Sequence, residues 1–92
     1  MNDKSYQIGD CFSFKRIGKT IYVLEEGKEE ENLYEFEDEG FYVVRSILDL
    51  QKFRYSELRN RLIIQYKFDE IDDDILEEFL DQLTQNGILC AT

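Results

Sequence analysis

The sequence predicts an α+β fold in which a three-stranded antiparallel sheet is followed by three helices. Two observations lead to this prediction: apolar and polar residues alternate in the first half of the chain, and apolar residues recur at helical spacing in the second half. A chain of 92 residues is long enough for one domain with a modest core. We therefore expect a single domain over residues 1–92, with strands at about 11–37 and helices at about 39–87.

Three segments of the first half are expected to be strands. Residues 12–15 alternate apolar and polar side chains, and Gly18 allows a tight turn after them because glycine adopts positive φ at little cost. Residues 20–25 are rich in β-branched and aromatic side chains, which favour a second strand. An acidic connection opens at Gly27 and leads to a short third strand at residues 33–36.

The second half is expected to form three helices. Asp38 and Ser56 are candidate caps for the first two, which a break near residues 50–54 separates. Aspartates at 72–74 favour the start of the third helix through its dipole, and Gly87 ends it. The apolar stripes are Phe41, Val44, Ile47 and Leu48 in the first helix, Leu58, Leu62 and Tyr66 in the second, and Ile75, Leu76, Phe79, Leu80 and Leu83 in the third.

The residue types present argue against catalysis and metal binding. The chain has no histidine, which excludes Ser-His-Asp and Cys-His chemistry and most catalytic zinc sites. Cys11 and Cys90 are too few for a structural zinc site, and we expect reduced thiols, with a bridge between the chain ends as the alternative. A calcium loop needs a glycine at its sixth position, and a loop that began at Asp69 or Asp72 would have Asp74 or Glu77 there. We expect no catalytic residue, no metal ligand and no cofactor.

The charge restricts the partners. A net charge of −10 repels nucleic-acid phosphates and anionic lipid headgroups, so we expect neither nucleic acid nor membrane as a partner. Solvation is the simplest role of this charge, and steering of a basic partner is the alternative. No apolar run approaches the roughly 18 residues of a membrane span, and residues 1–10 lack the apolar stretch of a signal peptide. We therefore expect a cytoplasmic protein.

The order of motifs from Leu33 onward resembles the PqqD-like family, the recognition elements (RREs) for precursor peptides of the RiPP class, which are made ribosomally and then modified. The matching residues are Tyr34-Glu35-Phe36-Glu37-Asp38-Glu39-Gly40, Val43-Val44, Ile47-Leu48, Glu57-Leu58, Leu62, Asp74, Phe79-Leu80, Leu83 and Gly87-Ile88-Leu89. They span about two thirds of the chain. Two positions depart from the family: Val44 replaces a frequent tryptophan, and Arg54 replaces a frequent threonine cap.

The resemblance implies a winged-helix-like fold and a non-catalytic function in natural-product biosynthesis. The leader region of a precursor peptide adds as an extended strand to the third strand, between it and the third helix. The domain then delivers the precursor to a modifying enzyme such as a radical SAM maturase, a cyclase or a leader peptidase. The alternative function is an acidic winged-helix protein-interaction or DNA-binding domain, although the third helix has no lysine or arginine to meet DNA.

The resemblance also implies the binding residues. The expected peptide-binding residues are Leu33, Tyr34, Glu35, Phe36, Ile75, Glu78, Phe79 and Gln82. On the strand, we expect Tyr34 and Phe36 to share the core face, and the acidic runs at 29–31 and 37–39 to keep the strand edge from pairing with copies of itself. On the helix, the opposite rim, which consists of Glu77, Leu80 and Thr84, is an alternative wall for the peptide.

Overall fold

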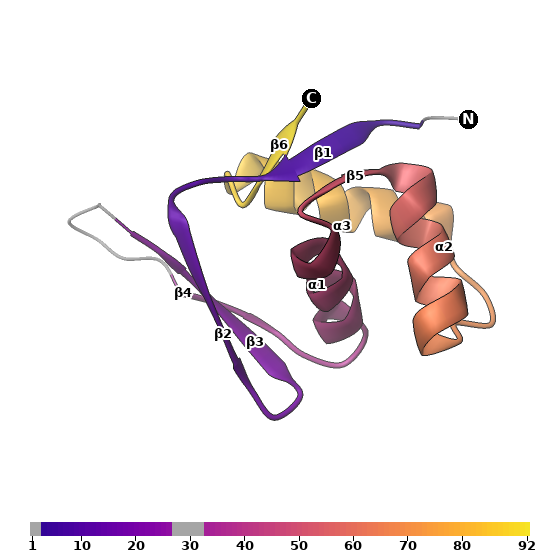
Figure 1. The fold of residues 1–92 in the computed structure, drawn as a ribbon, viewed down its shortest axis with the longest axis horizontal. Coiled ribbons are helices and arrows are strands. Elements are labelled where there is room, and N and C mark those ends of the chain that lie inside the picture. Colours follow the sequence, from indigo (N-terminus) through magenta and orange to yellow (C-terminus); the bar gives the residue numbers. More distant parts are fainter. Residues whose placement is uncertain (1–2, 27–32) are drawn as a thin grey trace.

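The computed structural model describes residues 3–26 and 33–92 and has an α+β architecture, as predicted. The strands of these two ranges are β1 (Ser5–Ile8), β2 (Phe12–Ile17), β3 (Thr20–Glu25), β4 (Leu33–Phe36), β5 (Lys52–Arg54) and β6 (Leu89–Ala91). The helices are α1 (Glu39–Leu50), α2 (Tyr55–Tyr66) and α3 (Asp73–Gln85). The strands form two antiparallel sheets of three strands, in the orders β2-β3-β4 and β5-β1-β6 (Figure 1). The predicted simple order of one sheet and then three helices is therefore wrong.

The sheet β2-β3-β4 is the one that the sequence predicts. Its first two strands are joined by a two-residue turn in which Gly18 has a φ of 61°, as the first central position of a type II′ turn requires. Residues of β3 alternate between buried and half-buried, with Ile21 and Val23 fully buried. On β4, Tyr34 and Phe36 pack against the core, which confirms the predicted facing of that strand.

The sheet β5-β1-β6 was not predicted from the sequence. Its strand β1 lies in the polar segment before residue 11, β5 occupies the expected break near residues 50–54, and β6 follows α3. Each ladder joins three residue pairs, and the central strand carries Tyr6, whose ring stacks on Phe53 with 5.5 Å between the centroids. Because β1 pairs with β6, Ser5 and Thr92 are neighbours, and the Thr92 N–H donates to the Ser5 carbonyl at 2.9 Å.

The three helices begin and end close to the predicted positions, but the predicted cap Ser56 is wrong and the predicted cap Asp38 makes no capping bond. Asp38 stands at the N-cap position of α1 with a φ of 55° and makes no side-chain cap bond. At α2 the cap is Arg54, not Ser56, and the Glu57 carboxylate accepts a hydrogen bond from the Arg54 backbone N–H at 3.1 Å. The predicted ends of α3 are confirmed, since Asp72 caps its start and Gly87 follows its end with a φ of 80°.

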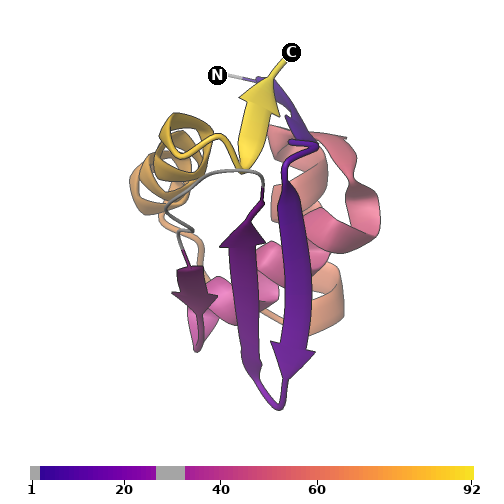
Figure 2. The same cartoon turned by 90° about the vertical axis from the view of Figure 1, so that its left-hand side faces the viewer.

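The core lies between the sheet β2-β3-β4 and the helices, with α1 packed directly behind the sheet (Figure 2). Its buried apolar residues are Tyr6, Ile21, Val23, Phe41, Val43, Val44, Ile47, Phe53, Tyr55, Leu58, Leu62, Leu76, Leu80, Leu83, Ile88 and Leu89. Within the described ranges, no helix has the length and apolar character needed to cross a membrane. Cys11 and Cys90 are exposed free thiols and not a bridge.

Candidate functional site

Strand β4 has an open edge, because within the described residues it pairs only with β3. The direction of its backbone groups follows from a hydrogen bond at the other side of the sheet, where the Glu26 N–H donates to the Cys11 carbonyl at 2.9 Å. Antiparallel pairs alternate between bonded and non-bonded positions. From Glu26 backward along β3, every second residue therefore bonds to β2, and the residues between them, Ile21 and Val23, bond to β4.

This alternation decides which β4 residues can bond to a further strand. Ile21 pairs with Phe36 and Val23 pairs with Tyr34, so Tyr34 and Phe36 use their N–H and carbonyl groups within the sheet. The N–H and carbonyl groups of Leu33 and Glu35 point away from β3, toward the open edge. Their side chains are exposed on the face opposite to the core.

Helix α3 lies beside this open edge. Figure 2 shows β4 as the strand of its sheet nearer to α3. The rings of Phe36 and Phe79 meet edge to face at 5.8 Å between centroids. Next to them is Gly40 at the start of α1, where an added Cβ would lie 3.9 Å from both rings, in ordinary van der Waals contact.

The helix presents the predicted wall toward β4. Ile75, Glu78, Phe79 and Gln82 follow one another at the spacing of a single helix face. Ile75 is 65% exposed, Glu78 and Gln82 are exposed, and Phe79 is half-buried. We call this wall together with β4 the β4–α3 face; it consists of Leu33, Tyr34, Glu35, Phe36, Ile75, Glu78, Phe79 and Gln82.

The alternative wall points elsewhere. Leu80 is fully buried, and the hydroxyl of Thr84 donates to the Leu80 carbonyl at 2.8 Å. Glu77 lines a polar hollow on the α2 side, together with Tyr55 and Arg59. The structure therefore brings Phe79 of the first wall to β4, while in the alternative wall Leu80 lies in the core and Glu77 lies on the α2 side.

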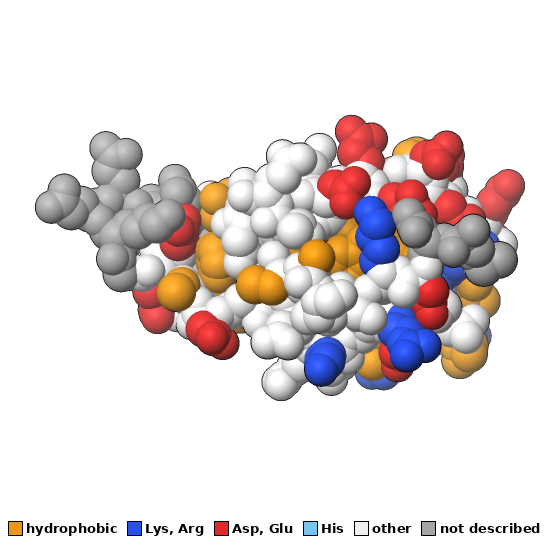
Figure 3. All heavy atoms as spheres, turned by 90° about the horizontal axis from the view of Figure 1, so that it is seen from above, with side chains coloured by type: hydrophobic (Ala, Val, Ile, Leu, Met, Phe, Trp, Pro, Cys, Tyr) orange, Lys and Arg blue, Asp and Glu red, His pale blue; other side chains and the backbone are white. Residues whose placement is uncertain are grey.

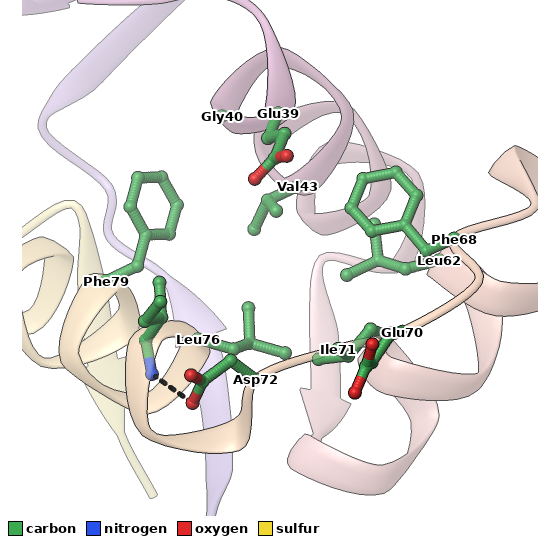
Figure 4. A pocket seen from close by; sticks show the side chains of 11 residues that line it. Glu39, Gly40, Val43, Leu62, Phe68, Glu70, Ile71, Asp72, Leu76 and Phe79 are labelled. Carbon is green, nitrogen blue, oxygen red and sulfur yellow. Dashed lines mark hydrogen bonds between the residues drawn. The ribbon is translucent and has the colours of Figure 1, made fainter.

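An apolar pocket opens at the end of the β4–α3 face where α3 begins. It has a volume of about 320 Å³ and lies between α1, α2, α3 and the connection from α2 to α3. Figure 4 shows the rings of Phe79 and Phe68 on opposite sides of this pocket, with Val43 and Leu76 between them and the carboxylate of Glu39 at its mouth. The lining residues are Glu39, Gly40, Val43, Leu62, Phe68, Glu70, Ile71, Asp72, Ile75, Leu76 and Phe79.

Sequence reasoning found residues on the α3 side of this pocket and missed those from the connection between α2 and α3. Ile75 and Phe79 were predicted as binding residues, whereas Phe68 and Ile71 were not singled out. The available signal was their spacing of three inside a strongly acidic connection, where apolar residues have no reason to occur unless they pack. Of the lining residues from α1 and α2, Leu62 was predicted as core, whereas Glu39, Gly40 and Val43 were named only within the family motif.

A polar network on the other side of α3 fastens that helix to α2. The Tyr55 hydroxyl donates to the Asp73 carboxylate at 2.6 Å, and the Arg59 Nε donates to the same oxygen at 3.0 Å. Burial, and secondly the bond to Asp73, raise the pKa of Tyr55 well above its ordinary value. The hydrogen bonds from Tyr55 and Arg59 lower the pKa of Asp73. This network fixes the position of α3 relative to the core, and with it the wall opposite β4.

The groups of this site can bind an extended ligand. Across residues 3–26 and 33–92, no group of three or more acidic, cysteine or histidine side chains is placed to hold a metal ion. What the site offers is a row of outward backbone donors and acceptors, an apolar pocket and exposed carboxylates. The predicted acidic run at 29–31 lies outside the described residues.

Comparison of the chain with models of known protein families, with curated proteins and with solved structures gave no match. The resemblance to PqqD-like recognition elements rests on the motifs in the sequence. Leader binding and delivery to an enzyme, which that resemblance implies, stay predictions.

Proposed function

We propose that this chain is a non-catalytic, winged-helix-like recognition domain that binds the leader region of a ribosomally made precursor peptide by strand addition to β4. The bound precursor is then delivered to a modifying enzyme, such as a radical SAM maturase, a cyclase or a leader peptidase. The observation that carries the proposal is the outward direction of the Leu33 and Glu35 backbone groups, beside a wall of α3 that exposes Ile75. An added strand bonds to these groups and places alternate side chains against the helix.

The two parts of the site have separate roles in this proposal. The backbone groups of β4 supply affinity that does not depend on the sequence of the peptide, because every residue except proline offers the same donor and acceptor. The wall of α3 and the apolar pocket supply selectivity for particular side chains. Tethering then raises the local concentration of the core peptide at the enzyme to about the millimolar range for a short flexible connection.

The charge of α3 supports a peptide and not DNA as the ligand. The helix contains five acidic residues and no lysine or arginine, whereas a helix in the major groove meets phosphates with basic side chains. The proposed function therefore includes no nucleic-acid partner.

The test begins with a peptide selected from a random 12-residue library on the intact chain, which is then titrated into the isotope-labelled protein. We expect the largest amide shifts at residues 33–36 and 75–82. Glu35→Pro should abolish binding, because proline removes the outward N–H. Glu35→Ala keeps that N–H and is the matched control, so it should keep most of the affinity.

A proline at the adjacent residue Tyr34, whose N–H points to β3 and not to the open edge, gives a second control. Tyr34→Pro removes an N–H that bonds to β3, so it should weaken the sheet itself, whereas Glu35→Pro should leave the helices and the β2–β3 hairpin folded. Shifts confined to β2 and α2, or full binding by Glu35→Pro, would contradict strand addition to β4. The leader assignment is tested by the same titration with the N-terminal segment of a short peptide encoded beside the gene for this chain.

A further inference from the structure

The negative charge of the chain is concentrated around the β4–α3 face. Residues 33–40 and 69–85, which form β4, the start of α1, the connection before α3 and α3 itself, contain twelve of the 21 acidic residues and none of the 11 basic ones. The rest of the chain carries nine acidic and eleven basic residues, so it is close to neutral. Figure 3 shows the same asymmetry at the helical end of the molecule, where acidic side chains crowd one margin and most Lys and Arg side chains lie along the other.

Most of these carboxylates are not used inside the domain. Within the described residues, the ion pair of Asp73 with Arg59 is the only one that the twelve make. Asp72 caps α3 by accepting hydrogen bonds from the N–H groups of Asp74 and Ile75. Glu35, Glu39 and Glu70 are exposed. Solvation alone would not require twelve of the 21 acidic residues to lie in the segments that form or adjoin this open strand edge.

The apolar pocket lies next to two of these carboxylates, those of Glu39 and Glu70. Its floor consists of aliphatic and aromatic side chains, while the carboxylates of Glu39 and Glu70 stand at its border on opposite sides (Figure 4). A volume of about 320 Å³ is at the lower end of the range of ligand pockets, which suits one large side chain of a peptide better than a whole small molecule. In an extended peptide, a cationic side chain two residues before or after the one in the pocket lies on the same face, where it can reach one of these carboxylates.

We infer that the ligand of the β4–α3 face is a basic extended peptide, in which a large apolar side chain fills the apolar pocket and a Lys or Arg two residues away, on the same face of the peptide, lies against Glu39 or Glu70. This inference rests on the proposed strand addition and names the class of peptide that it selects. An acidic peptide meets like charges on both walls and is disfavoured. A second copy of this chain is disfavoured for the same reason, since pairing two β4 edges would bring Glu35 of one copy close to the acidic residues of the other.

The test uses four synthetic 12-residue peptides of one host sequence, built from Thr, Ser and Val. Three carry a central Leu with Lys, Gln or Glu two residues away on each side, and the fourth carries Ala in the centre with Lys at the same two positions. Affinity is measured by fluorescence anisotropy with the intact chain, and the bound position is read from amide shifts. We expect the Lys–Leu peptide to bind about three- to tenfold more tightly than the Gln–Leu peptide, because each exposed ion pair adds a modest amount. The Lys–Ala peptide should bind at least about tenfold more weakly than the Lys–Leu peptide, because it leaves the pocket unfilled.

Matched variants separate the charge from the pocket. Glu39→Gln and Glu70→Gln should weaken the Lys–Leu peptide and leave the Gln–Leu peptide unchanged, whereas Asp10→Asn, which removes the same charge in the β1–β2 connection, should change neither. Ile75→Ser should weaken both Leu peptides, whereas Ile64→Ser, at a residue of α2 that is 75% exposed, should not. At 1 M salt the Lys and Gln peptides should converge, since the screening length falls to about 3 Å.

The outcomes distinguish this inference from the proposed function. Equal affinity of the Glu–Leu and Lys–Leu peptides, with amide shifts on residues 33–36, would overturn the basic ligand and leave strand addition standing. If Asp10→Asn weakened binding of the Lys–Leu peptide as much as Glu39→Gln does, the preference for Lys would reflect the overall charge of the chain, and the proposed contact with Glu39 and Glu70 would be wrong. Binding of the Lys–Leu peptide with shifts away from β4, or no binding by any of the four peptides, would overturn the inference and the proposed function together.

Discussion

The two three-stranded sheets differ in where their strands come from and in how their edges are used. The strands of β2-β3-β4 are consecutive in the chain, and the sheet ends in an edge strand whose outward face carries exposed Leu33 and Glu35. The strands of β5-β1-β6 come from the beginning, the middle and the end of the chain. Each of them contributes one fully or nearly fully buried side chain, namely Tyr6, Phe53 and Leu89.

The two sheets therefore have different roles, since one stabilises the fold and the other can accept a ligand strand. The sheet β5-β1-β6 closes the chain on itself and is held by buried side chains, so its loss should release both termini and α3. The sheet β2-β3-β4 is completed by local contacts and keeps one edge open, so a ligand strand can be added without breaking any existing bond. Mutations in β5-β1-β6 should therefore change stability without changing the open edge of β4, and mutations at that edge should change binding with little effect on stability.

The largest loss of stability is expected from Tyr6→Ala. Tyr6 is 2% exposed and stacks on Phe53, so truncation leaves a cavity at the centre of the closing sheet, at a cost of about 3–4 kcal/mol of unfolding free energy. Tyr34→Ala, at a half-buried position of the open sheet, should cost clearly less. Urea unfolding followed by circular dichroism measures both, with Tyr6→Phe as a control that keeps the ring. Equal losses for the two alanine variants would remove the distinction between the sheets.

A second prediction concerns Gly9, which lies in the connection between the two sheets. A Cβ at Gly9, between β1 and β2, would lie 2.4 Å from the Gly87 carbonyl oxygen, and the Gly9 N–H donates to the Ile88 carbonyl at 2.9 Å. Gly9→Ala must therefore push β1 and β6 apart, and we expect it to cost about 2 kcal/mol, in the range of other overpacked sites. Gly18→Ala meets no atom within 4 Å and should cost about 1 kcal/mol through its positive φ alone. Thermal unfolding of the two variants tests the order, which a larger loss at Gly18 would reverse.

The same contrast explains what the sequence could and could not predict. The strand β3 and the three helices have local signals, namely the alternation at Ile21 and Val23 and the apolar stripes of the helices, and their positions were predicted. The strands β1, β5 and β6 have only three or four residues each, and their partners are distant in the chain, so no local window contains the information that pairs them.

The site divides in the same way. The facing of Tyr34 and Phe36 follows from the period of two along a strand and was predicted. The outward phase of the Glu35 N–H was not predictable, because it depends on the register of three strands and not on residues 33–36 alone. The apolar pocket draws side chains from three helices and a connection, so Phe68 and Ile71 acquire a role only once those elements are packed.

A smaller effect is expected from Tyr55→Phe, at the residue that follows β5 directly. The Tyr55 N–H donates to the Lys4 carbonyl at 2.9 Å and continues the closing sheet, while its hydroxyl fastens α3 through Asp73. Losing the hydroxyl should cost about 1–2 kcal/mol, because a hydrogen bond to a charged group is lost but Asp73 keeps its bond to Arg59. The pKa of Tyr55 is raised in the fold, so this contribution is complete below the ordinary tyrosine pKa of about 10 and is lost as the pH rises above it. The stability difference between wild type and Tyr55→Phe should therefore shrink in strongly alkaline solution.

The smallest effect is expected on the acid side, from Asp73→Asn. Hydrogen bonds from Tyr55 and Arg59 hold the pKa of Asp73 below its ordinary value of 3.8. A carboxyl group whose pKa is lower in the folded state contributes stability above its unfolded pKa, and loses it as the pH falls through the folded one. The difference in melting temperature between wild type and Asp73→Asn should accordingly be constant near neutral pH and vanish as the pH falls below the ordinary value. Asp74→Asn removes the same charge from the next position in the first turn of α3, so subtracting its effect removes the contribution of the helix dipole. If both variants behaved alike at every pH, the network with Tyr55 and Arg59 would add nothing to the dipole, and α3 would be held against the closing sheet by its apolar face alone.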